Sequence, residues 1–121
     1  MSETDDRLQQ MLKAMADPTR FKILNMLQER HYCARALAIE LGITEAAVSQ
    51  HLSTLKRVGL VSGWRHGRHM HYQVNEEAVA FLLGAFELWG KRMATVQSCE
   101  EPNSCNFRLD DGSNRCLYSE F

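Results

Sequence analysis

Cysteine thiols have the widest chemistry of any side chains in this sequence. There are four of them, and three fall in the last quarter of the chain: Cys33, Cys99, Cys105 and Cys116. Thiolates bind soft ions, and three thiolates suit trigonal arsenite or antimonite. Thiols can also be oxidised reversibly. Turn residues at 110–113 predict a hairpin that would place the last two cysteines near each other, for an ion or for a disulfide.

A second set of side chains offers hydrogen bonds instead. Val48, Leu52 and Leu55 recur at i, i+4 and i+7, so they share one narrow face of a helix. The other side and its flanks carry small or hydrogen-bonding residues: Ala46, Ala47, Ser49, Gln50, Ser53, Thr54 and Arg57. A helix that enters the major groove of DNA needs little bulk, donors and acceptors, and no negative charge. The alternative is an ordinary solvated helix face.

These side chains suggest separate roles on a duplex. Gln50 can pair with the N6 and N7 atoms of adenine. Arg57 lies lower on the helix and suits the phosphate backbone. His51 lies toward the core edge, so both a packed structural role and a DNA contact stay open. The remaining members can reach bases or phosphates, or flank the face at its start: Thr44, Ser49, Ser53 and Thr54.

Charge is distributed unevenly along the chain. The formal net charge is −1, yet Glu45 is the only acidic residue between Thr44 and Val74. In the same stretch, Arg65 and Arg68 flank the predicted tip of a hairpin. Arginines there suit phosphates or a narrow minor groove, although a charged hairpin can also serve solubility alone. A basic surface on a neutral protein is typical of a nucleic-acid site.

Several helices must position these residues. Helical spacing predicts a first helix over 8–15, and Asp17-Pro18 predicts the cap and first position of a second. In that second helix we expect three residues to face inward: Phe21, Leu24 and Leu27. A third helix over 34–41 should end at Gly42, because glycine readily adopts the left-handed conformation past a helix end.

The fourth helix and the segments after it follow from similar signals. Thr44 is a good N-cap for a helix that runs to about residue 58 and ends at Gly59. Residues 60–64 and 69–74 predict two strands with His66-Gly67 as the turn. The third and fourth helices with the intervening turn therefore form a helix-turn-helix, and the hairpin forms its wing.

The predicted fifth helix, which follows Asn75, has two apolar stripes. One contains Val79, Leu82, Leu83, Phe86 and Met93, and the other contains Ala78, Phe81, Ala85 and Leu88. One stripe can cover the core of the domain. The second would stay wet in a monomer, which is costly. A homodimer that buries it around a two-fold axis is the simplest expectation, and a single thick core helix is the alternative.

The chain as a whole has 121 residues, enough for one modest core. We expect a mainly α domain with a small β-hairpin over 1–97, and a cysteine-containing tail over 98–121. The start of the chain is too acidic and polar for a secretory signal, and no apolar stretch is long enough to cross a membrane. The expected compartment is therefore the cytoplasm.

Taken together, these motifs resemble the ArsR/SmtB family over roughly residues 8–95. The resemblance rests on DPTR at 17–20, Leu37-Ala38, GITEAAVSQHL at 42–52, LKRVGLV at 55–61 and the wing at 65–72. It implies a homodimeric winged helix-turn-helix repressor that pairs through its first and last helices. Such repressors bind an imperfect palindrome in operator DNA and leave it when an inducer arrives, usually a metal or metalloid ion.

The inducer site departs from the patterns that this resemblance implies. Arg35 stands where a Cys-x-Cys pair starting at Cys33 would have its second cysteine, and residues 75–97 contain no histidine. Three tail cysteines remain as the predicted metal ligands: Cys99, Cys105 and Cys116. The expected effector is arsenite, antimonite, cadmium or zinc, with no cofactor needed for folding. A thiol redox switch and incidental cysteines with an unrelated inducer are the alternatives.

Further assignments concern the remaining cysteine, two histidines and other classes of protein. Cys33 suits a small buried apolar position or an extra ligand, and His69 with His71 could hold zinc. A small thiol enzyme would need a cysteine with a general base or a Cys-x-x-Cys pair, and the sequence has neither. A pure protein-interaction module would leave the acid-free helix face and the arginine-tipped hairpin without a purpose. We therefore expect no enzymatic activity.

Overall fold

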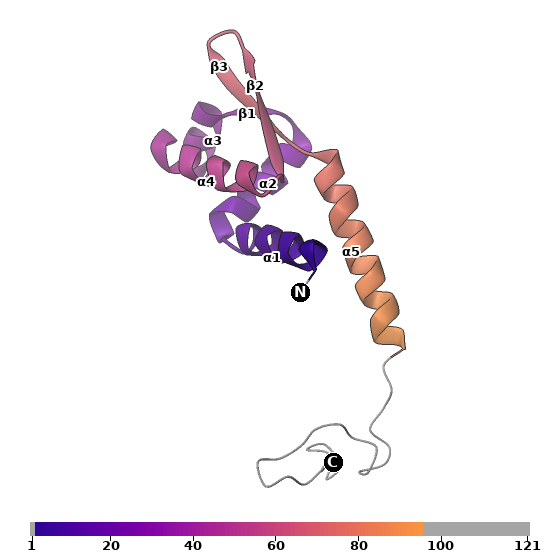
Figure 1. Ribbon diagram of the computed structural model, residues 1–121. Coiled ribbons are helices and arrows are strands. Elements are labelled where there is room, and N and C mark those ends of the chain that lie inside the picture. The colour runs from indigo at the N-terminus through magenta and orange to yellow at the C-terminus, as the bar shows by residue number, and fades with distance from the viewer. Residues whose placement is uncertain (1, 96–121) are drawn as a thin grey trace, which may run out of the picture. The chain divides into compact units, whose positions relative to one another are not determined.

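The computed structural model describes residues 2–95 of the chain (Figure 1). Its elements follow in this order: α1 (Glu3–Met15), α2 (Pro18–Glu29), β1 (Tyr32–Cys33), α3 (Ala34–Leu41), α4 (Glu45–Arg57), β2 (Val61–His66), β3 (His69–Val74) and α5 (Glu76–Ala94). The described residues fall in two units, 2–87 and 88–95. The described residues of the second unit continue α5. The mainly helical fold class is confirmed, with a small antiparallel sheet.

Local capping explains the starts of α1, α2 and α4 and the ends of α3 and α4. The side chains of Ser2, Asp17 and Thr44 each accept a hydrogen bond from a backbone N–H three residues later, as good N-caps do. Gly42 and Gly59 have φ angles of 68° and 82°, values that favour glycine after a helix. Both predicted stops are confirmed.

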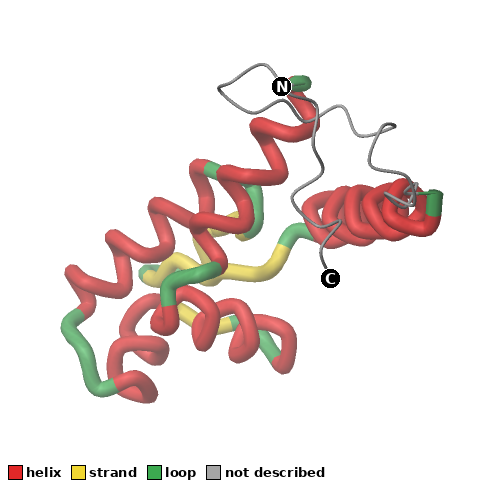
Figure 2. Tube along the Cα trace, turned by 90° about the horizontal axis from the view of Figure 1, so that it is seen from below, coloured by secondary structure: helices red, strands yellow, loops and turns green. Residues whose placement is uncertain are grey.

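The three strands form one antiparallel sheet in the order β1-β3-β2. The pairing of β1 with β3, which joins Tyr32 to Tyr72, was not predicted, because two residues are too short to show a period. His66 pairs with His69, so the tight turn is Gly67-Arg68 and lies one residue later than expected. Figure 2 shows the connected strands passing alongside the helices.

The core lies among the first four helices and the start of the sheet. Its largest fully buried side chains come from α1, α2, α3, α4 and the residue before β2: Met11, Ile23, Leu37, Val48, Leu52, Leu55 and Leu60. Leu24 and Leu27 are buried as predicted, but Phe21 is 50% exposed. The expectation for Phe21 was wrong, because Ile23 takes the inward position on that turn of α2.

Two sets of contacts hold the start of α5 against the earlier helices. The Arg7 guanidinium donates to the Glu77 carboxylate at 2.8 Å and lies 4.1 Å from the centre of the Phe81 ring. The Asn75 backbone N–H donates to the Leu60 carbonyl at 2.9 Å. The Asn75 side-chain amide donates to the Gly59 carbonyl at 2.8 Å, so it also binds the segment that follows α4.

The two sides of α5 differ in burial. Ala78 is fully buried, and Phe81 and Leu82 pack against the core. Val79, Leu83 and Phe86 are exposed to 41%, 67% and 47%. An apolar surface of this kind usually marks an interaction site in a soluble protein. No helix within residues 2–95 combines the length and the apolarity needed to cross a membrane.

Candidate nucleic-acid interface

The helix-turn-helix places α4 with one side in the core and the other in solvent. After α3, the Ile43 N–H donates to the Ala38 carbonyl at 3.1 Å, which closes the turn at Gly42. The inward side chains of α4 are Val48, Leu52 and Leu55, each at most 1% exposed. The three buried residues fix the rotation of α4 about its axis, so the positions opposite them face outward.

The residues proposed to contact DNA lie on this outward side or on the hairpin. Eight of them are exposed: Thr44, Ala46, Ser49, Gln50, Ser53, Arg57, Arg65 and Arg68. Ala47 and Thr54 are half-buried at its flanks. Two of the hydroxyl groups already have partners, because Thr44 Oγ1 accepts from the Ala47 N–H and Thr54 Oγ1 donates to the Gln50 carbonyl at 3.2 Å. We therefore regard Thr44 first as the cap that orients the start of α4.

A shallow hollow of about 440 Å³ lies on the outward side of α4. Its lining consists of small and hydrogen-bonding side chains with one arginine: Ser49, Gln50, Ser53, Thr54 and Arg57. No carboxylate contributes to it. Neutral and cationic donors of this kind can face base edges and phosphates without electrostatic repulsion.

The β2–β3 hairpin places two guanidinium groups at its tip. Arg65 is the penultimate residue of β2 and Arg68 lies in the turn. Behind them, imidazole and indole rings pack together on the sheet: Trp64 lies 4.8 Å from His31 and 5.8 Å from His71, measured between ring centres. Ring packing of this kind stabilises the sheet, because aromatic pairs contribute modestly beyond their buried area.

His51 has a structural neighbour that sequence reasoning missed. Its Nδ1 atom lies 3.4 Å from Nη1 of Arg20, and Arg20 Nε donates to the Ala14 carbonyl at 2.7 Å. One arginine at the start of α2 therefore connects the end of α1 with α4. The cap Asp17 lies beside it, and the hydrogen bond from the Arg20 backbone N–H lowers the pKa of the Asp17 carboxyl.

The described part of the chain contains no group of three or more His, Cys, Asp or Glu side chains that could hold a metal ion. Cys33 is half-buried rather than fully buried, and its Sγ accepts from the Ala36 N–H at 3.4 Å as the cap of α3. The predicted metal ligands Cys99, Cys105 and Cys116 lie outside the described residues.

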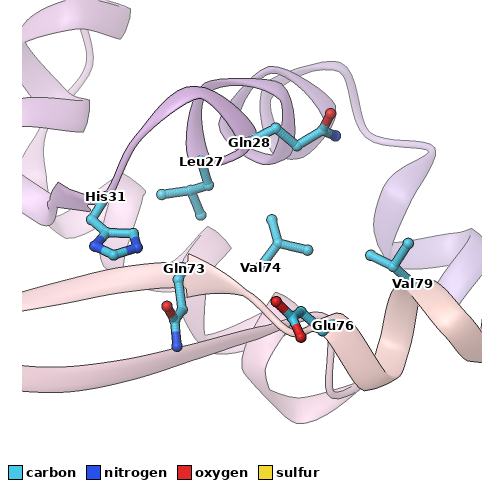
Figure 3. A pocket seen from close by; sticks show the side chains of 7 residues that line it. All are labelled: Leu27, Gln28, His31, Gln73, Val74, Glu76 and Val79. Carbon is cyan, nitrogen blue, oxygen red and sulfur yellow. The ribbon is translucent and has the colours of Figure 1, made fainter.

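A separate cavity of about 530 Å³ lies between α2, β3 and the start of α5. Figure 3 shows Leu27 and Val74 pointing toward each other there, with polar side chains around them. Its lining mixes apolar and polar residues: Leu27, Gln28, His31, Gln73, Val74, Glu76 and Val79. Sequence patterns did not predict this cavity, because it is formed by residues from three distant segments.

The fold is that of a winged helix-turn-helix protein. Its α4 packs one side in the core and presents a polar side to solvent, and the β2–β3 hairpin adjoins it. The model of a family described as "Bacterial regulatory protein, arsR family" matches residues 17–62. The chain is 40% identical to the nodulation protein NolR of Rhizobium meliloti over 87 residues. This match covers 71% of this chain and 71% of NolR. The chain belongs to the ArsR family.

Two further similarities support this assignment. An ArsR-like transcriptional regulator from Rhodococcus sp. RHA1 has a TM-score of 0.68 at 28% identity, over 77% of this chain and 92% of that one. A protein of Streptomyces lividans named "Probable mercury resistance operon repressor" is 35% identical over 64% of this chain and 62% of its own. The chain is thus a DNA-binding transcriptional regulator of the ArsR/SmtB type, and the thiol-enzyme alternative is set aside.

Proposed function

We propose that this protein is a homodimeric repressor that reads an imperfect palindrome in double-stranded operator DNA and is released by a thiophilic metal or metalloid ion. The observation that carries the DNA-binding part is the outward side of α4. Its central side chains Ser49, Gln50 and Ser53 are exposed, while the opposite side is locked in the core. A recognition helix that enters the major groove must present base-contacting side chains on one side, while its other side packs against the domain.

The hairpin extends the same basic surface. Arg65 and Arg68 are exposed, and guanidinium groups pair well with phosphate oxygens. In this proposal they contact the backbone or the minor groove beside the site that α4 reads. The wing then sets the register of the protein on the duplex, and α4 supplies the sequence preference.

The dimer follows from the apolar side of α5. Val79, Leu83 and Phe86 fall within an arc of about 60° on a helix that turns by roughly 100° per residue, and all three are exposed. A two-fold interface buries the same patch on both copies. The pair Arg7–Glu77 keeps the first helix beside the start of α5, in accord with pairing through the first and last helices.

The proposed inducer rests on thiol chemistry. The name of the Streptomyces lividans relative refers to mercury resistance. Thiolates are the protein ligands that soft ions prefer. Within residues 2–95 the side chains assemble no metal site, so we assign the ion to Cys99, Cys105 and Cys116 beyond them, with arsenite, antimonite, cadmium or zinc as the effector.

A mobility-shift experiment tests the DNA-binding proposal. The probe is a duplex that carries the promoter of the gene encoding this chain, and a shuffled duplex of equal length is the control. We expect the reduced protein to bind the promoter more tightly by a factor of at least about 1,000, the lower end of the usual specificity ratio. Equal affinity for the two duplexes would contradict sequence-specific repression.

The inducer needs its own experiment. A variant with Cys99, Cys105 and Cys116 all replaced by serine should bind the promoter duplex as the parent does, but arsenite should no longer release it. Cys33→Ser is the matched control and should keep the response. Release of the triple variant at the same arsenite concentration as the parent would remove the tail cysteines from the proposal.

A further inference from the structure

A cationic cleft separates the end of α1 from the second half of α4. It has a volume of about 480 Å³ and takes its lining from three helices and the residue after α4: Gln10, Lys13, Ala14, Arg20, Thr54, Arg57 and Val58. Lys13, Arg20 and Arg57 supply one positive charge each from α1, α2 and α4. No acidic side chain lines the cleft, so its electrostatic character is that of an anion site.

Arg20 is held in place before any ligand arrives. Its Nε atom donates to the Ala14 carbonyl and its Nη1 atom lies 3.4 Å from His51. The side chain is half-buried, so its rotamer freedom is already reduced. A guanidinium carries five N–H donors in a planar fork, and these two contacts leave donors for an anion.

One carboxylate, that of Asp17, attracts the charge of Arg20 from outside the lining of the cleft. Asp17 lies at the start of α2, where one of its oxygens accepts from the Arg20 backbone N–H at 3.0 Å. It therefore serves as the cap of α2 and is absent from the lining of the cleft. Lys13 and Arg57 are exposed, so a ligand can reach both without opening the fold.

The position of the cleft indicates which anion it receives. It shares Thr54 and Arg57 with the hollow on the outward side of α4. The sugar-phosphate backbone borders the major groove that a recognition helix enters, so phosphates of a duplex that faces the hollow lie toward the neighbouring cleft. We propose that Lys13, Arg20 and Arg57 together bind a backbone phosphate beside the bases that α4 reads, an inference that rests on the proposed function.

This assignment enlarges the DNA-binding surface beyond α4 and the wing. It brings in α1 and the start of α2, neither of which was predicted to contact DNA. Phosphate contacts add affinity without sequence preference. The cleft should therefore strengthen binding to every duplex by the same factor.

The test measures how binding depends on salt. Fluorescence anisotropy gives Kd for the promoter duplex and for a shuffled duplex over a range of KCl concentrations. Lys13→Gln should lower the slope of log K against log salt by about 0.9, the value for one released counterion. It should also weaken both duplexes equally, so that their affinity ratio stays unchanged. Lys22→Gln, an exposed α2 lysine outside the cleft, is the matched control and should behave as the parent.

Two outcomes would overturn the assignment. One is a slope in Lys13→Gln equal to that of the parent, and the other is an equal loss of slope in Lys22→Gln. Arg57→Gln is a second variant and should also lower the slope. If the parent protein binds neither duplex, the result contradicts the proposed DNA-binding function as a whole and not the assignment of the cleft in particular. Replacing KCl by potassium phosphate at equal ionic strength tests whether the cleft also binds free phosphate. If it does, free phosphate competes with the duplex and lowers the DNA affinity of the parent more than that of Lys13→Gln.

Discussion

The helices α4 and α5 both repeat their apolar residues at helical spacing, yet the side chains on their outward sides differ in chemistry. Each buries one side in the core, through Leu52 and Leu55 in α4 and through Ala78 in α5. Outside, α4 presents serines and a glutamine, whereas α5 presents Leu83 and Phe86 at 67% and 47% exposure. The inward sides of both helices stabilise the fold, and the chemistry of the outward sides determines which partners can bind.

This difference indicates two kinds of partner for one small domain. The polar side chains on the outward side of α4 are hydrated in the free protein. They exchange this hydration for hydrogen bonds only with a polar partner such as the edges of bases. Apolar groups on α5 gain free energy from any contact that removes water. We therefore expect α4 to bind nucleic acid and α5 to bind a second copy of the chain, and each side can be altered separately.

The largest expected effect comes from placing a charge on the outward side of α5. Leu83→Arg should raise the dissociation constant of the dimer by at least about 100-fold, because burial of an unpaired charge costs several kcal/mol. A two-fold interface contains the substituted residue twice. Analytical ultracentrifugation at micromolar concentration should then detect monomers.

The control for this variant adds the same charge to another exposed position. Ala80 is exposed on α5 and lies about 60° or more around the helix from the residues 79, 83 and 86. Ala80→Arg should remain dimeric. A dimer of unchanged stability in Leu83→Arg would show that this side of α5 does not form the interface.

The next effect concerns the inward side of α4. Leu55 is fully buried, so Leu55→Ala should lower the free energy of unfolding by about 2–5 kcal/mol through lost burial and a cavity. Urea denaturation followed by circular dichroism measures this change. Ser53→Ala, on the outward side of the same helix, should change the stability by less than about 0.5 kcal/mol. Similar losses in the two variants would contradict the described rotation of α4.

The outward side of α4 predicts a smaller, purely functional effect. Gln50→Ala should reduce discrimination between the promoter duplex and a shuffled duplex by about 1–3 kcal/mol, the value of one bidentate base contact. Anisotropy titrations at fixed salt give both affinities. Gln9→Ala, on the exposed side of α1, should leave the ratio unchanged. If the ratio also stays constant in Gln50→Ala, this residue does not read a base.

The smallest effect is a dependence on pH at the start of α2. The hydrogen bond from the Arg20 N–H lowers the pKa of Asp17 in the folded protein, so the ionised cap stabilises the fold above the usual aspartate pKa of about 3.9. This contribution is lost as pH falls through the lowered pKa. Urea titrations at several pH values should show the advantage of the parent over Asp17→Asn shrinking in that window. A constant difference down to low pH would contradict this role of the charge.

Local signals in the sequence accounted for most of the fold. Capping side chains such as Thr44, stop glycines such as Gly42 and the period of Val48 and Leu52 each depend on nearby residues, and all are confirmed. The outward side of α4 follows from the same period, so its candidate residues could be selected before the structure. What they bind stays a prediction.

Features that depend on distant residues could not be read in this way. Phe21 has a helical position that looks inward, but Ile23 fills the core in its place. The strand β1 exists only because Tyr32 meets Tyr72 across the sheet. Likewise, the contact between Arg20 and His51 joins residues that are 31 positions apart. No local period encodes such a pairing.

The two hydrogen bonds of Asn75 have a mechanical consequence. They attach the beginning of the helix proposed for pairing to the carbonyls of Gly59 and Leu60, immediately behind the helix proposed for reading. A displacement of Asn75 therefore acts directly on the two residues Gly59 and Leu60 that follow α4. If two copies pair through α5 and read DNA through α4, as proposed, these bonds connect the pairing helix to the segment directly behind the reading helix.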